Sequence, residues 1–326
     1  MTPTKTPQGV PAIWVLGEAL VDFVPHPVDG MVAYLPKPGG SPFNAAKAAA
    51  LAGAQVHFVG GISTDFFGDM LAADLRRAGV DTGLAPRSAM PTTLAFVTFE
   101  GGQPRYAFFN NLTSTSLITP PPLVGLMGSG DILSIGSISL IDRPGADNIA
   151  AVALAAADTT LLAFDPNARA DMVTDWPDWR QRIDRLLAVA GLIKLSVEDL
   201  EILRPGMTAA AFAAAQLAME ARMVVITDGG NGATAFSRNA AVTVAAPKVV
   251  VEDTVGAGDT LMGTLLAELC HRGLTDPLAL GAVGEGPLRN ILHRAVTAAA
   301  LNCRVSGCNP PTRRQVDDWL SGTADV

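Results

Sequence analysis

Asp259 stands at the start of an expected helix, directly after a Gly-Ala-Gly turn in the segment DTVGAGD. Such a turn exposes the backbone N–H groups of Gly256, Ala257 and Gly258 at the positive end of the helix dipole, where an anion is favoured. A carboxylate beside this anion hole can take a proton from a hydroxyl while the N–H groups stabilise a transferring phosphoryl group. The residues alone leave a second interpretation open, in which Asp259 only caps the helix.

A second glycine pair opens another helix in the segment GGSPFN. We expect Ser41 to be the N-cap of this helix and Pro42 its first residue. Gly39 and Gly40 would let a small ligand approach the backbone, and Asn44 offers both a donor and an acceptor to sugar hydroxyls. Taken alone, the segment is also compatible with a plain loop-to-helix turn.

Three further polar segments follow expected strands at their carboxyl ends, where open α/β sheets bind ligands. Asp22, in GEALVD, could bind two hydroxyls of a polyol, and Arg169, in DPNAR, could bind a phosphate or an acidic group. The glycine-rich turn TDGGNG, at 227–232, could hold nucleotide phosphates through backbone N–H groups. Each has an ordinary alternative: a solvated acid, a surface arginine and a tight hairpin turn.

The apolar runs supply a scaffold for these residues. Strands fit at 13–16, 56–59, 131–135, 160–164, 191–195 and 223–227, with helical stretches between most of them. This alternation predicts a largely parallel sheet covered on both faces, followed by a mostly helical chain after Gly256. Two β-rich runs flank Gly101 and Gly102 and indicate a hairpin. With the segment 19–38, we expect this hairpin to form a small β appendage.

Composition excludes several classes of protein. The chain has 326 residues, of which 49% are hydrophobic and 17% charged, and its net charge of −8 argues against a nucleic-acid-binding surface. The longest apolar stretch, 149–164, is interrupted by Asp158, so no membrane span is expected. The first ten residues lack a signal peptide, and the three cysteines cannot form a disulfide framework, which favours a cytoplasmic protein. Walker A, dinucleotide-binding and H-E-x-x-H motifs are missing.

Taken together, the motifs resemble the ribokinase-like (PfkB) family of sugar kinases over nearly the whole chain. Two segments carry most of the resemblance, GGSPFNAAKAAALAG at 39–53 and DTVGAGD at 253–259, and the other motifs follow in family order up to GCNPP at 307–311. The resemblance implies a three-layer α/β/α sandwich with a mainly parallel central sheet. It also implies one domain spanning 1–326, with a β lid formed by about 19–38 and 92–112.

The resemblance also implies an activity, the transfer of the γ-phosphoryl group of ATP to a primary hydroxyl of a sugar. Asp259 would be the general base, and the N–H groups of residues 256–258 would form the anion hole. The residues expected to hold the sugar are Asp22, Gly39, Gly40, Asn44, Arg105 and Arg169. The residues expected to contact the nucleotide are Lys194, Ser196, Thr227, Gly229, Gly232 and Asn302.

Metal ions are expected on the same grounds. Mg2+ accompanies ATP in the family, and a monovalent cation, K+, would lie beside the anion hole on carbonyls such as those of Asp253 and Val255. Many relatives carry N-x-x-E near the metal and phosphates, where this chain has Ser196 and Asp199. The sequence therefore leaves open whether Glu198 or Asp199 orients the water molecules of Mg2+.

The segments GSISL at 136–140 and FDPNAR at 164–169 are similar to those of fructokinases, so we expect fructose as the sugar. FDPN-x-R is shared with 2-keto-3-deoxygluconate kinases, which is the main alternative; ribose or a nucleoside is a weaker one. A sugar sensor without catalysis is disfavoured because Asp259 and its Gly-Ala-Gly turn are intact. The expected partners are a sugar and ATP, with no nucleic acid or membrane, and a homodimer through the β lid.

Overall fold

Short, fully buried apolar runs form the strands of one eight-stranded sheet. The computed structural model describes residues 10–100 and 103–323. Its main sheet has the order β14-β13-β12-β11-β10-β9-β1-β4 and is parallel from β4 to β12, with the last two strands antiparallel. Its strands are β1 (Ala12–Leu16), β4 (Gln55–Phe58), β9 (Ile132–Gly136), β10 (Leu161–Asp165), β11 (Leu192–Ser196), β12 (Met223–Thr227), β13 (Ala233–Ser237) and β14 (Ala241–Val244).

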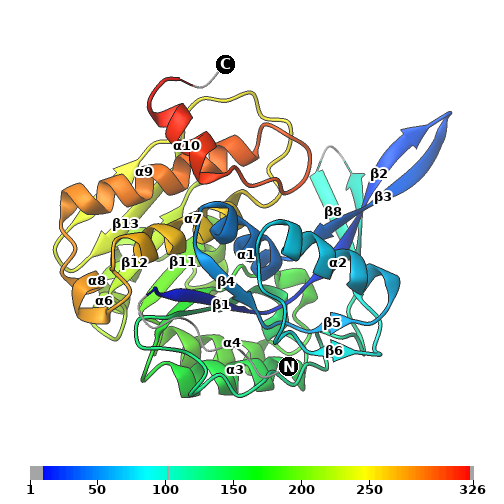
Figure 1. Ribbon diagram of the computed structural model, residues 1–326, viewed down its shortest axis with the longest axis horizontal. Helices are drawn as coiled ribbons and strands as arrows, with labels where there is room; N and C mark the ends of the chain where they lie inside the picture. Colours follow the sequence, from blue (N-terminus) through cyan, green and yellow to red (C-terminus); the bar gives the residue numbers. More distant parts are fainter. Residues whose placement is uncertain (1–9, 101–102, 324–326) are drawn as a thin grey trace.

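Helices cover both faces of this sheet, so the expected α/β/α sandwich is confirmed (Figure 1). Alternate residues of β1 point to opposite faces: Ile13 and Val15 join one apolar cluster, while Trp14 and Leu16 join the other. The first cluster includes residues of α1 (Ser41–Leu51), α2 (Phe66–Arg77), α7 (Ala257–His271), α8 (Pro277–Gly281) and α9 (Glu285–Asn302). The second includes residues of α3 (Gly145–Ala156), α4 (Trp176–Leu187), α5 (Val197–Leu203) and α6 (Ala209–Leu217).

A separate four-stranded sheet stands at one edge of the sandwich, in the order β3-β2-β7-β8. Its strands are β2 (Leu20–Val28), β3 (Met31–Gly39), β7 (Thr93–Glu100) and β8 (Gln103–Phe109). β2 pairs with β7 only over 20–23 but with β3 as far as Val28 and Met31, so the end of this hairpin projects from the molecule (Figure 1). The expected β appendage is therefore present, and the turn at Gly101 and Gly102 lies outside the described residues.

The start of α1 differs from the expected capping pattern. Gly40, at φ 106°, is the N-cap, and Ser41 is already the first helical residue, so the prediction of Ser41 as N-cap is wrong. Only glycine adopts this φ without strain, and a Cβ on Gly40 would lie 2.9 Å from the Glu18 carbonyl oxygen. The hydroxyl of Ser41 is thereby released from capping and is available for another contact.

α1 and α7 pack against each other at very short range. A Cβ on Gly263 of α7 would lie 2.3 Å from the carbonyl oxygen of Ala45 and 2.7 Å from the Cβ of Ala48. Small side chains on both helices are what allow this approach, because interiors are close-packed and leave no room for an added methyl group. The alanine-rich stretch at 45–50 therefore serves helix packing.

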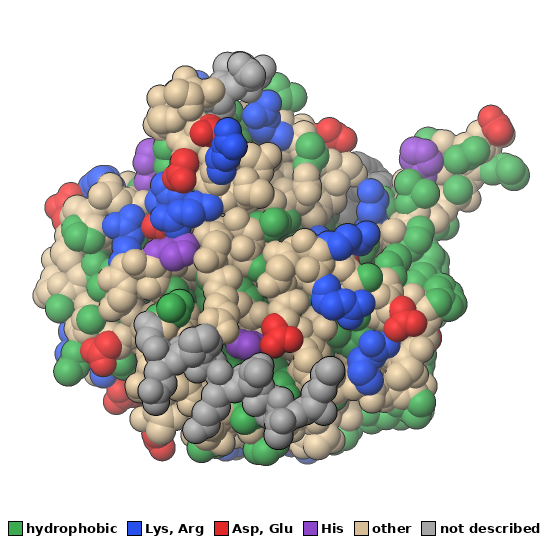
Figure 2. Space-filling model, in the orientation of Figure 1, with side chains coloured by type: hydrophobic (Ala, Val, Ile, Leu, Met, Phe, Trp, Pro, Cys, Tyr) green, Lys and Arg blue, Asp and Glu red, His purple; other side chains and the backbone are tan. Residues whose placement is uncertain are grey.

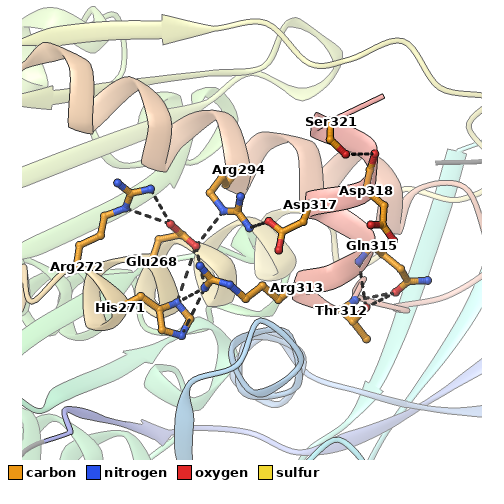
Figure 3. Close-up of polar contacts among 10 residues, drawn as sticks. All are labelled: Glu268, His271, Arg272, Arg294, Thr312, Arg313, Gln315, Asp317, Asp318 and Ser321. Atoms are coloured by element: carbon orange, nitrogen blue, oxygen red, sulfur yellow. Dashed lines mark hydrogen bonds and ion pairs between the residues drawn. The ribbon is translucent and has the colours of Figure 1, made fainter. Parts of the chain in front are cut away.

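The far end of α7 is fixed by a buried carboxylate. Glu268 is 2% exposed and accepts hydrogen bonds from Arg272 Nε at 3.1 Å and from Arg294 Nε at 3.0 Å, while Arg313 Nη1 lies 3.2 Å away (Figure 3). Arg294 also bonds Asp317 Oδ1 at 2.5 Å. These contacts join α7 to α9 and to α10 (Arg313–Leu320), and so hold the helix that begins at the Gly-Ala-Gly turn. Within residues 10–100 and 103–323, no helix is long and apolar enough to cross a membrane.

We expect Gly263→Ala to lower the free energy of unfolding by about 1–3 kcal/mol, because the methyl group would force α1 and α7 apart. The matched control is Gly230→Ala, where a Cβ would meet nothing within 4 Å. There the substitution should raise stability by up to about 1 kcal/mol by restricting the unfolded chain. Urea denaturation of both variants measures the difference, and equal effects would contradict the close packing of the two helices.

Candidate active site

The carboxylate of Asp259 is held by two side chains from the first turn of α1. Ser41 Oγ donates to Asp259 Oδ1 at 2.6 Å, and Asn44 Nδ2 donates to Oδ2 at 2.9 Å. Residues three apart lie on one face of a helix, so α1 presents both donors together. Asp259 lies in the first turn of α7 and is 9% exposed. Its position is set by contacts from a segment more than 200 residues away in the sequence.

The Gly-Ala-Gly turn offers unpaired backbone donors next to this carboxylate. Among the described residues, the N–H groups of Gly256 and Gly258 have no acceptor within the protein, while Ala257 N–H donates to the Thr254 carbonyl at 3.2 Å. Gly256 is the N-cap of α7 in the left-handed region, at φ 74°, and a Cβ there would lie 2.3 Å from Cys308 Sγ. The turn therefore has the geometry of an anion hole at a helix N-terminus.

A buried ion pair lies beneath this turn. A Cβ on Gly258 would come within 3.0 Å of Lys194 Nζ, and Nζ bonds Asp165 Oδ2 at 2.7 Å. Burial alone would lower the pKa of Lys194, but the neighbouring carboxylates of Asp165, Asp199 and Asp259 outweigh it and raise this pKa, so the ammonium stays charged. Burial raises the pKa of Asp165 to about 6, although Lys194 opposes the shift. A positive charge therefore lies directly behind the anion hole.

Most of the residues expected to hold a sugar come together near Asp259. The carboxylate of Asp22 packs against Gly39, where a Cβ would lie 2.3 Å from Asp22 Oδ2. Burial, reinforced by the Asp259 charge and opposed by Arg169, raises the pKa of Asp22 to about 7. Asn44 Oδ1 is buried without a hydrogen-bond partner, which is costly unless a ligand donates to it.

Two arginines were expected beside the sugar. Arg169 is exposed and bonds Asn167 Oδ1 at 2.7 Å, and its charge reaches Asp22. Arg105 is paired with Thr98 in the lid sheet, and its side chain lies outside the described part of the structure. Asp22 itself belongs to a strand, so the alternative of a solvated loop acid does not apply to it.

The residues expected to contact the nucleotide are more scattered. The segment TDGGNG forms a hairpin turn between β12 and β13, as the alternative interpretation had it. Thr227 is half-buried and Gly229 exposed at this turn. Gly232, at φ 102°, is needed for backbone packing, because a Cβ would lie 2.0 Å from the Val244 carbonyl oxygen. Of these three, only Thr227 and Gly229 present open surface to a ligand.

Asp199 has a structural function in this arrangement. It forms a capping box with Ser196 at the start of α5: its Oδ2 accepts from Ser196 N at 2.9 Å, and its Oδ1 accepts from Ala168 N at 2.7 Å. Both oxygens are thus engaged in a residue that is 5% exposed. Glu198 is exposed on the same turn, so of the two acids only Glu198 is open to a hydrated metal ion.

Asn302 was expected near an adenosine, but its side chain faces the interior and is 0% exposed. Its Nδ2 donates to the Val255 carbonyl at 2.8 Å, and its Oδ1 accepts from Asn309 N at 2.8 Å. Asp253 bonds Val255 N through Oδ1 and Gly307 N through Oδ2. Asn302 and Asp253 therefore hold the loop before the anion hole in shape, a structural role rather than the nucleotide contact that we expected.

Sequence reasoning missed two residues that the structure brings into the site. Ser41 was assigned to capping, although its spacing of three from Asn44 was a signal that both could face one target. Asp165 was given no role, and its pairing with Lys194 depends on the parallel register of β10 and β11, in which Phe164 pairs with Ile193. No signal in a single sequence fixes that register.

The sandwich, its small separate sheet and the glycine turn at the start of α7 define a class of protein, the ribokinase-like phosphotransferases. The structure superimposes on that of a fructokinase from Xylella fastidiosa with bound ATP, with a TM-score of 0.86 and 26% identity over 96% of this chain and 99% of the other. A fructokinase from Vibrio cholerae O395, solved with fructose, ADP and calcium, gives a TM-score of 0.81 over 95% and 99%; at 23% identity it supports the fold alone.

The family follows from the sequence. The model of the pfkB family carbohydrate kinases matches residues 12–314, so the chain belongs to this family. A fructokinase from Rhizobium leguminosarum bv. trifolii is 35% identical over 84% of this chain and 84% of its own length. A probable fructokinase-3 from Arabidopsis thaliana is 33% identical over 90% of this chain and 86% of its own length. The resemblance to the PfkB family is confirmed.

We expect Lys194→Met to lower the free energy of unfolding by about 3–5 kcal/mol at pH 8, because Asp165 would be left buried without its partner. The loss should shrink at pH 5, since an acid with a raised pKa protonates as the pH falls and then carries no charge to desolvate. Arg289→Met is the control: it breaks an exposed pair with Glu285 and should cost less than about 1 kcal/mol at either pH. Denaturation at the two pH values checks this, and a pH-independent loss would count against the buried pair.

Proposed function

We propose that this protein is an ATP-dependent fructokinase, which transfers the γ-phosphoryl group of ATP to a primary hydroxyl of D-fructose and makes fructose 6-phosphate. The observation that carries the proposal is the pairing of a fixed, buried carboxylate, Asp259, with unpaired N–H donors of the same helix turn. The curated relatives reported above, at 35% and 33% identity, are fructokinases, which supports fructose as the sugar.

Asp259 is the proposed general base. Its two oxygens each accept one hydrogen bond from α1, which leaves a further lone pair on each for the proton of a sugar hydroxyl. As the proton moves to Asp259, the hydroxyl oxygen attacks the γ-phosphorus and the bond to the ADP oxygen breaks. The unpaired N–H groups of Gly256 and Gly258, helped by the Ala257 N–H that is shared with Thr254, and the charge of Lys194 behind them stabilise the negative charge of the phosphoryl group.

The sugar is proposed to lie between Asp22, Gly39, Gly40 and Asn44, with Arg105 and Arg169 at its edge. The carboxyl group of Asp22 can accept from two hydroxyls, and the unpartnered Asn44 Oδ1 from a third. Because the lid strand β2 carries Asp22 itself, closing of the lid would bring this acid to the sugar and exclude water from the transfer. Lys194, Ser196, Thr227 and Gly229 remain the proposed nucleotide side of the site.

Mg2+ is the proposed metal, and it would neutralise the charge of the phosphates. Among the described residues, no group of three or more His, Cys, Asp or Glu could cage a metal ion. This fits Mg2+, which keeps several water molecules and is usually bound by one or two carboxylates together with substrate phosphates. Exposed Glu198 is the acid that fits such a hydrated ion, and K+ is proposed on the carbonyls of Asp253 and Val255.

A second copy of the chain is the proposed partner of the lid. β3 and β8 are edge strands of the small sheet. The hairpin of β2 and β3 projects from the molecule with apolar side chains along it (Figures 1 and 2), and Met31 and Val32 are 71% and 66% exposed. Large apolar side chains on an open edge favour pairing with another chain. We place the protein in the cytoplasm, because its three cysteines are free and its co-substrate is ATP.

Fructose should give the highest kcat/KM in an ATP-coupled panel of fructose, ribose, tagatose, adenosine and 2-keto-3-deoxygluconate. The polar groups around Asn44 and Asp22 are matched to hydroxyls, and a site built on hydrogen bonds discriminates strongly against ligands that leave them unpaired. The control is the same panel without ATP. A clear preference for 2-keto-3-deoxygluconate would overturn the choice of sugar and assign Arg169 to its carboxylate.

Asp259→Asn should reduce kcat by about 10²–10⁴-fold, because the amide cannot take the hydroxyl proton. Fructose binding, measured by calorimetry, should change little, since the side chain keeps its size. The Asn44 contact would lose one favourable partner, so we expect at most a small drop in affinity. Turnover equal to that of the wild type would remove Asp259 from the role of general base.

The double variant Met31→Glu with Val32→Glu should convert a dimer into a monomer in sedimentation velocity, because it puts like charges on the facing edge strands. Leu278→Glu is the matched control: this side chain is 82% exposed on α8, far from the lid, and its variant should stay dimeric. A wild-type protein that sediments as a monomer at micromolar concentration would disprove pairing through the lid.

A further inference from the structure

Glu18 is a fully buried acid at the point where three segments of the site meet. It lies two residues after the end of β1, is 1% exposed and lies under the turn that begins α1. Its Oε1 accepts from Ser41 N at 3.2 Å, and its Oε2 accepts from Ser139 N at 3.2 Å. Ser139 belongs to the short helix η1 (Ser137–Leu140), which follows β9. One carboxylate thus joins the ends of two neighbouring strands and the start of a helix.

The burial of Glu18 destabilises its charged form, and no cation offsets this cost among the described residues. In the described residues, no Lys, Arg or His forms an ion pair with Glu18, and burial raises its pKa to about 7 against the hydrogen bonds from Ser137, Ser41 and Ser139. What favours the charge is the N-terminus of α1, where an anion interacts well with the helix dipole and with unpaired N–H groups. α1 has no acidic residue in its own first turn, so Glu18 fills this position from another segment.

The carboxylate of Glu18 contacts Ser41, one of the two residues whose side chains hold Asp259. The N–H group of Ser41 donates to Glu18 Oε1, and its hydroxyl donates to Asp259 Oδ1. Gly40 packs on Glu18, and a Cβ there would lie 3.1 Å from Glu18 Cγ. A change in the position of Glu18 therefore shifts the first turn of α1, and with it both donors to Asp259.

We propose that Glu18 is a positioning residue for the phosphoryl transfer, which holds Ser41 and Asn44 in register with Asp259 by joining the start of α1 to η1. This inference rests on the proposed function and adds to it a residue that touches neither sugar nor nucleotide. Only a carboxylate accepts from both N–H groups. A glutamine presents an NH2 to one of them and breaks that contact.

The alternative is that Glu18 only stabilises the fold, and the chain contains a matched control for it. Asp131 is 3% exposed and binds the opposite end of β1: Oδ1 accepts from Ala12 N at 2.9 Å and Oδ2 from Trp14 Nε1 at 2.9 Å. Glu18→Gln and Asp131→Asn therefore remove comparable buried carboxylates at the two ends of the same strand. Both should lower Tm, since each leaves a buried donor unsatisfied.

The two variants should differ in kinetics. We expect Glu18→Gln to lower kcat by about tenfold and to raise the KM for fructose, with the KM for ATP unchanged, because the loss of one buried acceptor is enough to misalign α1. Asp131→Asn should leave kcat, the KM for fructose and the KM for ATP within about twofold of the wild-type values. Its contacts lie at the other end of β1, too far from Asp259 to be coupled to it. Constants are measured per folded molecule, with the folded fraction taken from circular dichroism.

A double-mutant cycle tests the route of the effect. If Glu18 acts through the first turn of α1, Glu18→Gln should cost less kcat in a Ser41→Ala background than in the wild type, because only the Asn44 donor is then left to displace. Full additivity of the two changes would overturn this route. If Glu18→Gln does not fold, Glu18→Asp takes its place: it keeps the charge but is one methylene too short to reach both N–H groups, and the same shift in kcat and fructose KM is expected.

The outcomes separate the two proposals. Wild-type and Asp131→Asn proteins that do not phosphorylate fructose would refute the proposed function, and the comparison would then be run with whichever sugar of the panel is turned over. Active wild-type and control proteins, together with a Glu18→Gln variant whose kcat and fructose KM match theirs, would overturn the positioning role and leave the proposed function intact.

Discussion

The active end of this protein depends on one contact, the pair of hydrogen bonds from α1 to the carboxylate of Asp259. For both donors to reach it, the first turns of α1 and α7 must lie side by side. That condition explains the small residues along the two helices, including Gly263 against Ala45 and Ala48. It also explains the ion network around Glu268, which fixes the other end of α7 (Figure 3). The apolar composition of the chain therefore reflects close helix packing in a three-layer sandwich.

The electrostatics of the site follow from gathering several acids where a polyanion must also bind. Burial raises the pKa values of Asp22 and Asp165, and the nearby Asp259 carboxylate adds to both shifts. The chain balances them locally, with Lys194 behind the anion hole and the positive end of α7 in front of it. The net charge of −8 therefore says little about phosphate binding, because the relevant field is set within a few ångströms by fixed groups.

The fold was predictable because its signals are local. Short apolar runs and glycine-opened helices are visible within short windows of the sequence, and they predicted the parallel sheet, the β appendage and the turn before Asp259. What could not be predicted depends on contacts between distant residues. Ser41 is free to donate a hydrogen bond to Asp259 because Gly40 is the N-cap. Asp165 meets Lys194 because of the strand register, and the buried Asn302 side chain is hydrogen-bonded to the Val255 carbonyl. Each of these outcomes depends on burial, which no single window encodes.

The lid hairpin has a consequence for how relatives of this chain can diverge. β2 leaves the sandwich two residues after Glu18, and β3 returns directly to Gly40, so both ends of the ribbon are anchored in the site. Beyond Phe23, however, the strands of the ribbon pair only with each other among the described residues. Residues added there in matched pairs, one to each strand, lengthen the ribbon without changing the register at Asp22. Evolution can thus extend or shorten this arm, and with it the contacts made outside the molecule, while the chemistry at its base is inherited intact.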